Sequence, residues 1–308
     1  MLKLYLNYHK KREVLAKNQN LSYIYALFAV LLWSTVATAF KISLRYLSPL
    51  ELLFYSSFVS LALLSSILLY QKRLADAFRY LRRNFLLVLI LAAINPFLYY
   101  LVLFKAYELL PAQEAQAINY TWALTLTYLS VIFLRHKLSA YDILSGFIAY
   151  FGVLVIATKG DIFSLHFSNT QGVLLAIFST VLWSFYWIFN TKAKIDPTIS
   201  LFCNFFIGFI LIAFYMFFTE GFKEVGLKGL LSSGYVGLFE MGITFLLWLK
   251  ALKYSQNTSK TANLIFLSPI ISLVFIHFIV GEKIENSTIF ALFLILSALI
   301  LQRLKLKR

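Results

Sequence analysis

The sequence predicts an all-α membrane protein whose ten transmembrane helices are arranged as two inverted repeats of five helices each. Three observations predict this fold: the composition, ten long apolar segments, and a similarity between the two halves of the chain. Of 308 residues, 61% are hydrophobic and only 13% are charged, and the mean hydropathy is +0.80. A soluble domain carries roughly 25% charged residues and cannot bury so much apolar surface. The chain is therefore expected to lie in a lipid bilayer.

Ten apolar segments are long enough to cross a bilayer, which takes about 20 residues in a helix. They cover residues 22–41, 50–70, 85–104, 113–134, 143–158, 172–191, 199–218, 231–249, 262–280 and 287–302. The connections between them are too short for a soluble domain. Residues 1–21 are interpreted as a retained cytoplasmic lead, because the apolar stretch that follows is too long for a signal-peptide core. Residues 303–308 form a basic cytoplasmic tail.

The net charge of +15 comes from Lys and Arg side chains that lie between the apolar segments. If the N-terminus is cytoplasmic, 21 of the 28 Lys and Arg residues fall on the cytoplasmic side and 7 on the other side. Positive residues are retained on the cytoplasmic side of membranes. The bias predicts a multi-pass protein of the inner membrane with both termini in the cytoplasm. Nucleic-acid binding would instead need a basic face on a folded domain.

The two halves of the chain share short similar segments, which occur in the same order in each half. Leu31–Ser34 (LLWS) aligns with Val181–Ser184 (VLWS), and Leu103–Ala106 (LFKA) aligns with Trp248–Ala251 (WLKA). These matches predict two five-helix units, residues 22–158 and 172–302. An odd number of spans turns the second unit upside down, an arrangement typical of secondary transporters. The alternative is chance matching between apolar sequences.

Several short motifs carry a resemblance to a known family. They are LLWS in the first span, Ser48–Pro49 before the second, Leu267–Pro269 in the ninth, and Gly281–Leu301, which is similar to a family loop and closing helix. On these residues the chain resembles EamA-type ten-helix members of the drug/metabolite transporter superfamily. Asn119–Trp122 (NYTW) resembles a stretch of the aromatic amino-acid exporters in that superfamily. The resemblance implies alternating-access transport of a small metabolite.

Glu240 is the only acidic residue near the middle of a predicted span. An ionisable group inside a membrane is costly and normally faces a cavity or a partner. Gly237 and Thr244 are three and four residues away, so the three are expected to share one helical face. We hypothesise that Glu240 binds a substrate amine or takes up a coupling proton. The alternative is a structural carboxylate that is hydrogen-bonded between helices.

Other polar and aromatic residues are candidates for the same substrate or proton site. The repeat offset of 145 places Asn95 opposite Glu240, next to Pro96, which is expected to kink the third span. The remaining candidates are Trp33, Ser34 and Thr38 in the first span, Tyr99 in the third, Asn119 and Trp122 in the fourth, Trp183 and Ser184 in the sixth, and Thr244 in the eighth. Asn119 and Trp122 are expected to share a face. Such residues also serve as packing contacts between membrane helices.

The sequence favours a secondary carrier over a membrane-embedded enzyme. It has no HExxH metal motif, no phosphate-binding loop and no paired catalytic carboxylates, and its one cysteine rules out a disulfide within the chain. We expect neither a cofactor nor a metal. The expected cargo is an amino acid or related compound, with export favoured and protons as a candidate partner. The alternative is a carrier for uptake or exchange of nucleotide-like, vitamin or sugar-conjugate substrates. A monomer is compatible with the sequence, which does not determine the oligomeric state.

Overall fold

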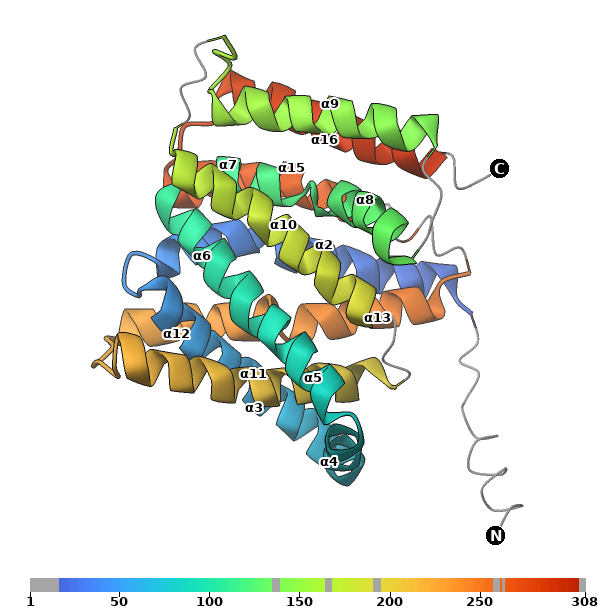
Figure 1. Ribbon diagram of the computed structural model, residues 1–308, viewed down its shortest axis with the longest axis vertical. Helices are drawn as coiled ribbons and strands as arrows, with labels where there is room; N and C mark the ends of the chain where they lie inside the picture. Colours follow the sequence, from blue (N-terminus) through green and yellow to red (C-terminus); the bar gives the residue numbers. More distant parts are fainter. Residues whose placement is uncertain are drawn as a thin grey trace.

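The computed structural model describes residues 17–134, 139–163, 168–190, 195–256, 261 and 264–304, and every regular element in these ranges is a helix (Figure 1). Residues 1–16 of the predicted lead and 305–308 of the predicted tail lie outside the described residues. The all-α prediction is confirmed for the part of the chain that is described.

The helices follow the predicted segments in chain order. The first five segments correspond to α2 (Gln19–Ser43), α3 (Pro49–Tyr70), α5 (Phe85–Ala92) with the π-helical η1 (Ala93–Leu98) and α6 (Tyr99–Leu109), α7 (Ala112–Asn119) with α8 (Trp122–Leu134), and α9 (Ala140–Ala157). The last five correspond to α10 (Thr170–Asn190), α11 (Pro197–Thr219), α12 (Leu227–Phe239) with α13 (Ile243–Tyr254), η2 (Leu264–Phe266) with α15 (Leu267–Phe275) and η3 (Ile276–Val280), and α16 (Asn286–Leu304).

Length and composition alone would let seven of the described helices cross a bilayer. They cover Gln19–Ser43, Pro49–Tyr70, Phe85–Leu109, Ala140–Ala157, Thr170–Asn190, Pro197–Thr219 and Leu227–Tyr254. Two shorter apolar helices, Leu264–Val280 and Asn286–Leu301, accompany them. The fourth predicted segment is divided into α7 and α8 at Tyr120 and Thr121, and neither piece reaches spanning length.

The sequence interpretation treated the connection between the second and third segments as a loop. This connection contains the short helix α4 (Leu74–Arg83), at the lower edge of Figure 1. Ala77 and Leu81, one turn apart, are buried against the bundle, while Arg79, Arg82 and Arg83 are exposed. Ten residues cannot cross a bilayer, but this pattern suits a helix that lies along its surface.

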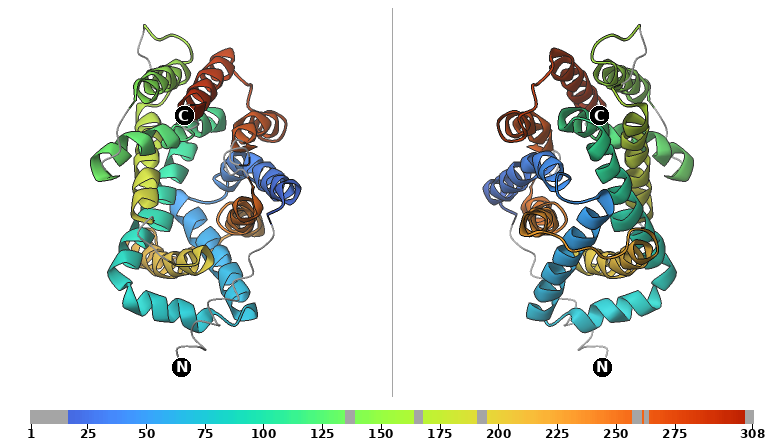
Figure 2. Two further views of the ribbon diagram at one scale, coloured as in Figure 1. Left: turned by 90° about the vertical axis from the view of Figure 1, so that its right-hand side faces the viewer. Right: turned by 90° about the vertical axis from the view of Figure 1, so that its left-hand side faces the viewer.

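Elements from the two predicted halves pack against each other. The helices α9 and α16 lie side by side at the top of Figure 1, and α2 packs against α12, α13 and α15. On the other side of the bundle α10 contacts α6 and α8, and α11 contacts α3 and α5 (Figure 2). The core therefore joins helices that are far apart in the sequence.

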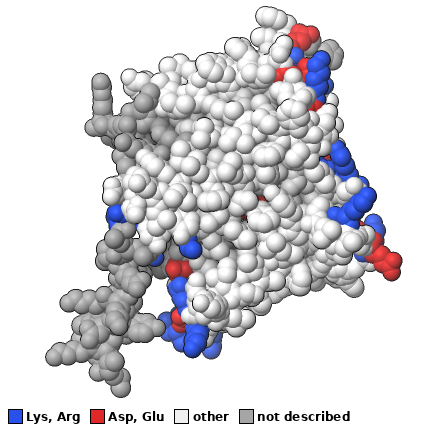
Figure 3. All heavy atoms as spheres, turned by 180° about the vertical axis from the view of Figure 1, so that it is seen from behind, with Lys and Arg blue, Asp and Glu red and all other residues white. Residues whose placement is uncertain are grey.

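Charged side chains gather at opposite margins of the molecule. Figure 3 shows a broad face that is almost free of charge, with Lys, Arg, Asp and Glu at its two ends. Large apolar side chains are exposed on the helices, among them Phe147 at 75% and Phe293 at 66%. An uncharged band between charged margins is the surface that a bilayer requires of a spanning protein.

Candidate functional site

Glu240 lies at a break between two helices. α12 ends at Phe239, α13 begins at Ile243, and the three residues between them form a turn. Such a break leaves backbone carbonyls without helical partners, and in a membrane they must be satisfied by neighbouring groups. The hydroxyl of Ser60 on α3 donates to the carbonyl of Met241 at 3.0 Å, and the hydroxyl of Thr244 donates to that of Phe239. The turn is thus held in place by side chains on either side of it.

The break alters the predicted arrangement around Glu240. Gly237, Glu240 and Thr244 do not share one continuous helical face, because the turn interrupts the helix between the second and third of them. Gly237 packs instead on α3, where an added Cβ would come within 2.4 Å of the carbonyl oxygen of Ser56. The sequence interpretation assumed an unbroken helix because no proline marks this position.

The carboxylate of Glu240 accepts hydrogen bonds from two other helices. The hydroxyl of Tyr100, on α6, donates to Oε1 at 3.1 Å. The indole N–H of Trp33, on α2, forms a second side-chain hydrogen bond. Three elements far apart in the sequence therefore meet at one acidic group.

Aromatic rings pack around the side chains that contact this carboxylate. The ring of Trp33 lies 5.7 Å from that of Phe245 and 5.5 Å from that of Trp248, measured between centroids. Tyr99 stands 4.6 Å from Trp183, which in turn lies 6.3 Å from Phe245. We call Glu240, Tyr100, Trp33, Tyr99, Trp183 and Phe245 the Glu240 cluster. A carboxylate flanked by aromatic faces can bind an organic cation by charge and by cation–π attraction.

The candidates of the fourth span lie beside this cluster. Asn119 donates through Nδ2 to the hydroxyl of Ser179 at 2.9 Å and also forms a side-chain hydrogen bond with Tyr99. The ring of Trp122 lies 6.4 Å from Trp183. Asn119 and Trp122 are not on one continuous helix, because the chain turns at Tyr120 and Thr121 between them, but both contact α10.

Three candidates make local contacts away from Glu240. The hydroxyl of Ser184 donates to the carbonyls of Thr180 at 2.7 Å and Trp122 at 3.2 Å. That of Ser34 donates to the carbonyl of Val30 at 2.6 Å. Thr38 lines a cavity on the flank of the molecule whose lining residues include none of the Glu240 cluster. Ser34 and Thr38, four residues apart in the first span, therefore lie in separate surroundings.

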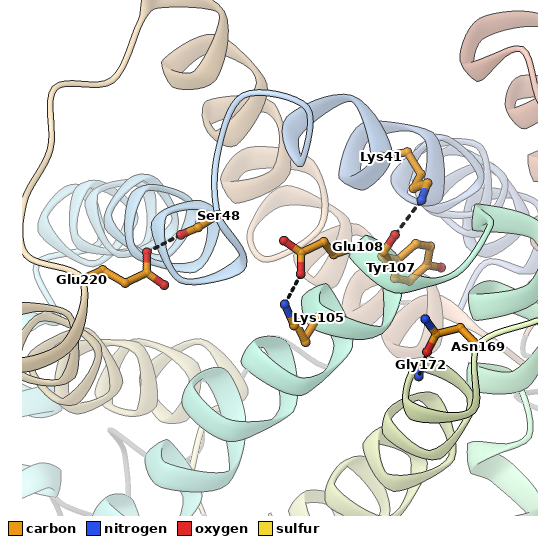
Figure 4. Close-up of polar contacts among 8 residues, drawn as sticks. All are labelled: Lys41, Ser48, Lys105, Tyr107, Glu108, Asn169, Gly172 and Glu220. Carbon is orange, nitrogen blue, oxygen red and sulfur yellow. Dashed lines mark hydrogen bonds and ion pairs between the residues drawn. The ribbon is translucent and has the colours of Figure 1, made fainter.

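The C-terminal end of α2 is hydrogen-bonded to the end of α6. Lys41, near the end of α2, donates through Nζ to the carbonyl of Tyr107 at 2.7 Å (Figure 4). It also donates to the carbonyl of Leu110 at 2.7 Å. At the same end of the molecule the hydroxyl of Ser48 donates to Glu220 at 2.5 Å. These contacts are structural ties between helix ends.

Asn95 lies at a second helix break. Its backbone, at φ −143° and ψ 119°, is not helical, and Pro96 follows it within η1. The kink predicted for the third span is thus present. The side chain is 2% exposed, and Tyr186 is a hydrogen-bonding neighbour, whereas Oδ1 has no partner among the described residues.

Sequence reasoning missed Tyr100 as a partner of Glu240, and Phe245 and Trp248 as neighbours of Trp33. With aromatic residues making up 18% of the chain, no pattern distinguished these three from packing aromatics. Among the described residues, no three His, Cys, Asp or Glu side chains lie together as a metal site would require. The carboxylate and its aromatic partners are the chemistry that this region offers.

A model of the EamA-like transporter family matches residues 20–158 and again residues 170–303. The chain belongs to the EamA-like transporter family. Similar proteins include the uncharacterized transporter YvbV of Bacillus subtilis, 26% identical over 231 residues and 74% of each chain. An uncharacterized transporter of Archaeoglobus fulgidus is 23% identical over 84% of this chain and 90% of its own.

A protein of known crystal structure has the same fold, with a TM-score of 0.64 at 20% identity over 93% of this chain and 99% of that one. Membership of the family makes this EamA-like protein a transporter rather than an enzyme. It is a multi-pass membrane protein that works on a small molecule in a lipid environment.

Proposed function

We propose that this EamA-like protein is a secondary carrier that exports an amino acid or a related compound across the inner membrane. The observation that carries the proposal is the position of Glu240, in a helix break, bonded to Tyr100 and Trp33 of the other half of the chain. A carboxylate that ties the two halves together at the membrane interior can exchange these bonds for a substrate amine or a proton.

Ten spans in two inverted five-helix repeats form part of this proposal. The family model matches the chain twice, over stretches of similar length, which supports a duplication. The two halves also break at related positions: Asn95 and Glu240 are 145 residues apart, the offset that aligns Leu103–Ala106 with Trp248–Ala251. Broken helices at the interface of inverted repeats are where secondary transporters bind their cargo, and rocking of one repeat against the other gives alternating access.

An amino acid with a flat side chain fits the chemistry of the Glu240 cluster. The carboxylate would bind the amino group, and the partly exposed ring of Trp33 offers a face on which an aromatic side chain can stack. The resemblance of Asn119–Trp122 to aromatic amino-acid exporters supports the same class and the direction of export. The bias of Lys and Arg supports an orientation with both termini in the cytoplasm.

The test measures flux of a panel of amino acids, including aromatic ones, in proteoliposomes with and without an imposed pH gradient. Glu240→Gln is compared with wild type and with Glu108→Gln, a matched change at an exposed carboxylate that pairs with Lys105. Losing one partner of a buried charge pair costs about 2–5 kcal/mol, so we expect substrate affinity to fall about thirtyfold or more if Glu240 binds the amine. If Glu240 takes up the coupling proton instead, the gradient loses its effect while exchange persists.

Each outcome decides a different part of the proposal. If wild type transports a member of the panel and Glu240→Gln transports it equally well, Glu240 has no part in the mechanism. A wild type that moves no amino acid would overturn the substrate class, and the panel would then turn to nucleotides, vitamins and sugar conjugates. Glu108→Gln is expected to behave as wild type throughout.

A further inference from the structure

A cavity of about 510 Å³ lies on the flank of the molecule, between α2, α12 and the α15–η3 helix. Two of its apolar lining residues are largely exposed, Leu231 at 66% and Ile279 at 53%. The cavity therefore opens away from the bundle, toward the lipid. We call it the flank groove; its lining residues are Thr35, Thr38, Ala39, Ile42, Tyr46, Lys228, Leu231, Ser232, Tyr235, Phe275 and Ile279.

One end of the flank groove is positively charged. Lys228 is the second residue of α12, and its Nζ lies 5.8 Å from the centroid of the Tyr46 ring. In the described part of the chain it forms no ion pair with a carboxylate. Gly226 precedes the helix and has no side chain to cap it. The N-terminus of a helix carries partial positive charge and free N–H groups. Lys228 and the N-terminus of α12 together therefore favour the binding of an anion at this end of the groove.

Hydroxyl groups lie deeper in the flank groove. Thr38 is 4% exposed, and its Oγ1 has no hydrogen-bond partner among the described residues. A buried hydroxyl without a partner is costly, so an acceptor from a ligand would stabilise it. Further in, the hydroxyls of Thr35 and Tyr235 bond to each other at 2.7 Å. The groove thus has a cationic rim, one unsatisfied hydroxyl below it and an apolar wall.

We propose that the flank groove binds one anionic phospholipid from the leaflet in which α12 begins. The phosphate lies against Lys228 and the α12 N-terminus, an ester carbonyl accepts from Thr38, and an acyl chain packs on Ala39, Ile42 and Phe275. The spacing fits, because Lys228 lies over Tyr46, and Tyr235, seven residues or about 10 Å further along α12, bonds to Thr35, so Thr38 lies between these two levels. That is the order of groups in a phospholipid. A water-soluble anion would leave the apolar, lipid-facing wall uncovered.

The test is native mass spectrometry of the full-length protein titrated with phosphatidylglycerol, with diacylglycerol of the same chains and inorganic phosphate as competitors. Lys228→Gln is expected to weaken binding of one phosphatidylglycerol about fivefold. Thr38→Val removes only the hydroxyl and is expected to weaken it by a similar factor. Lys223→Gln is the matched control, since Lys223 is exposed in the connection before α12 and does not line the groove.

The proposal stands if both groove variants bind phosphatidylglycerol about fivefold more weakly while Lys223→Gln binds it as wild type does. Equal loss in Lys228→Gln and Lys223→Gln would overturn it, because surface charge in general would then explain binding. Wild-type binding in both groove variants would also overturn it. Displacement by inorganic phosphate would show a site for a soluble anion, and equal binding of diacylglycerol would show an apolar groove with no role for the phosphate.

Discussion

The two helix breaks differ in what holds them. At Asn95, the ring of Pro96 packs on α11 at Gly208, where an added Cβ would lie 2.6 Å from Pro96 Cδ and Cγ. At Glu240, the freed carbonyls accept from the hydroxyls of Ser60 and Thr244, and the carboxylate accepts from Tyr100. The first break is shaped by packing and the second by hydrogen bonds.

This difference separates two roles at positions related by the repeat offset. A break filled by a proline ring against a glycine is a fixed joint, since close-packed groups leave no alternative arrangement. A break held by hydroxyl and carboxylate groups can exchange its partners for those of a ligand. We therefore expect changes at the Asn95 break to act on stability, and changes around Glu240 to act on transport as well.

The largest expected effect on stability is at the Asn95 break. Gly208→Ala would push a Cβ into the Pro96 ring, and overpacking of this kind costs about 1–3 kcal/mol of unfolding free energy. The measurement is thermal unfolding in detergent, followed by a fluorophore that labels the buried thiol of Cys203 as it becomes exposed.

Gly234→Ala is the control for this change. No heavy atom lies within 4 Å of the Cβ that it would add to α12, so the midpoint of unfolding should not fall. Equal midpoints for Gly208→Ala and Gly234→Ala would show that packing does not hold the first break.

A smaller effect is expected from Tyr100→Phe. This change removes the hydroxyl that donates to Glu240 but keeps the ring, which lies 5.5 Å from that of Phe104. A hydrogen bond to a charged group contributes about 1.5 kcal/mol or more, so we expect substrate affinity to change about tenfold. Equilibrium binding of the radiolabelled amino acid identified in the flux assay gives the value.

Tyr128→Phe is the same substitution away from the Glu240 cluster, where the hydroxyl donates to the backbone carbonyl of Asp142 at 2.8 Å. It should leave affinity unchanged. If both phenylalanine variants alter affinity alike, Tyr100 acts through general stability and the proposed contrast between the breaks fails.

The smallest effect is expected at Ser60. Ser60→Ala leaves the carbonyl of Met241 without its donor, which costs about 1 kcal/mol of unfolding free energy. The same thiol-labelling measurement applies. Ser66→Ala, on the exposed part of the same helix and bonded only to the carbonyl of Ala62, is the control and should have little effect. A Ser60→Ala midpoint equal to that of Ser66→Ala would show that the turn at Glu240 does not depend on this bond.

Much of the helical framework could be predicted from the sequence. Apolar length predicted where helices run, because a bilayer accepts only segments whose backbone groups bond internally. Pro96 marked the break in the third span. The break at Glu240–Gly242 could not be predicted in this way, since no proline lies there and the hydroxyl that bonds the carbonyl of Met241 comes from Ser60 on α3. Helix α4 was not predicted for another reason: it has too few apolar residues to be recognised as a membrane-spanning segment.

The candidate site was predictable in its central residue and not in its neighbours. Glu240 stood out because a carboxylate in the middle of an apolar segment is costly and rare. Its partnership with Trp33 and Tyr100 depends on how α2 and α6 pack against the break. Thr38 shows the converse: it lies one helical turn from Ser34 and was predicted for the same site, yet it lines the flank groove.

By itself, the sequence determined that the chain is helical, that it belongs in a membrane and where its apolar segments lie. These properties follow from composition and from the local period of the helix, which need no knowledge of neighbouring segments. Only the tertiary structure decided which side chains meet: Glu240 with Tyr100, Pro96 with Gly208, and Lys228 with Tyr46. The physical reason is that these contacts join residues 112 to 182 positions apart, and their partners are chosen by helix packing and not by local sequence.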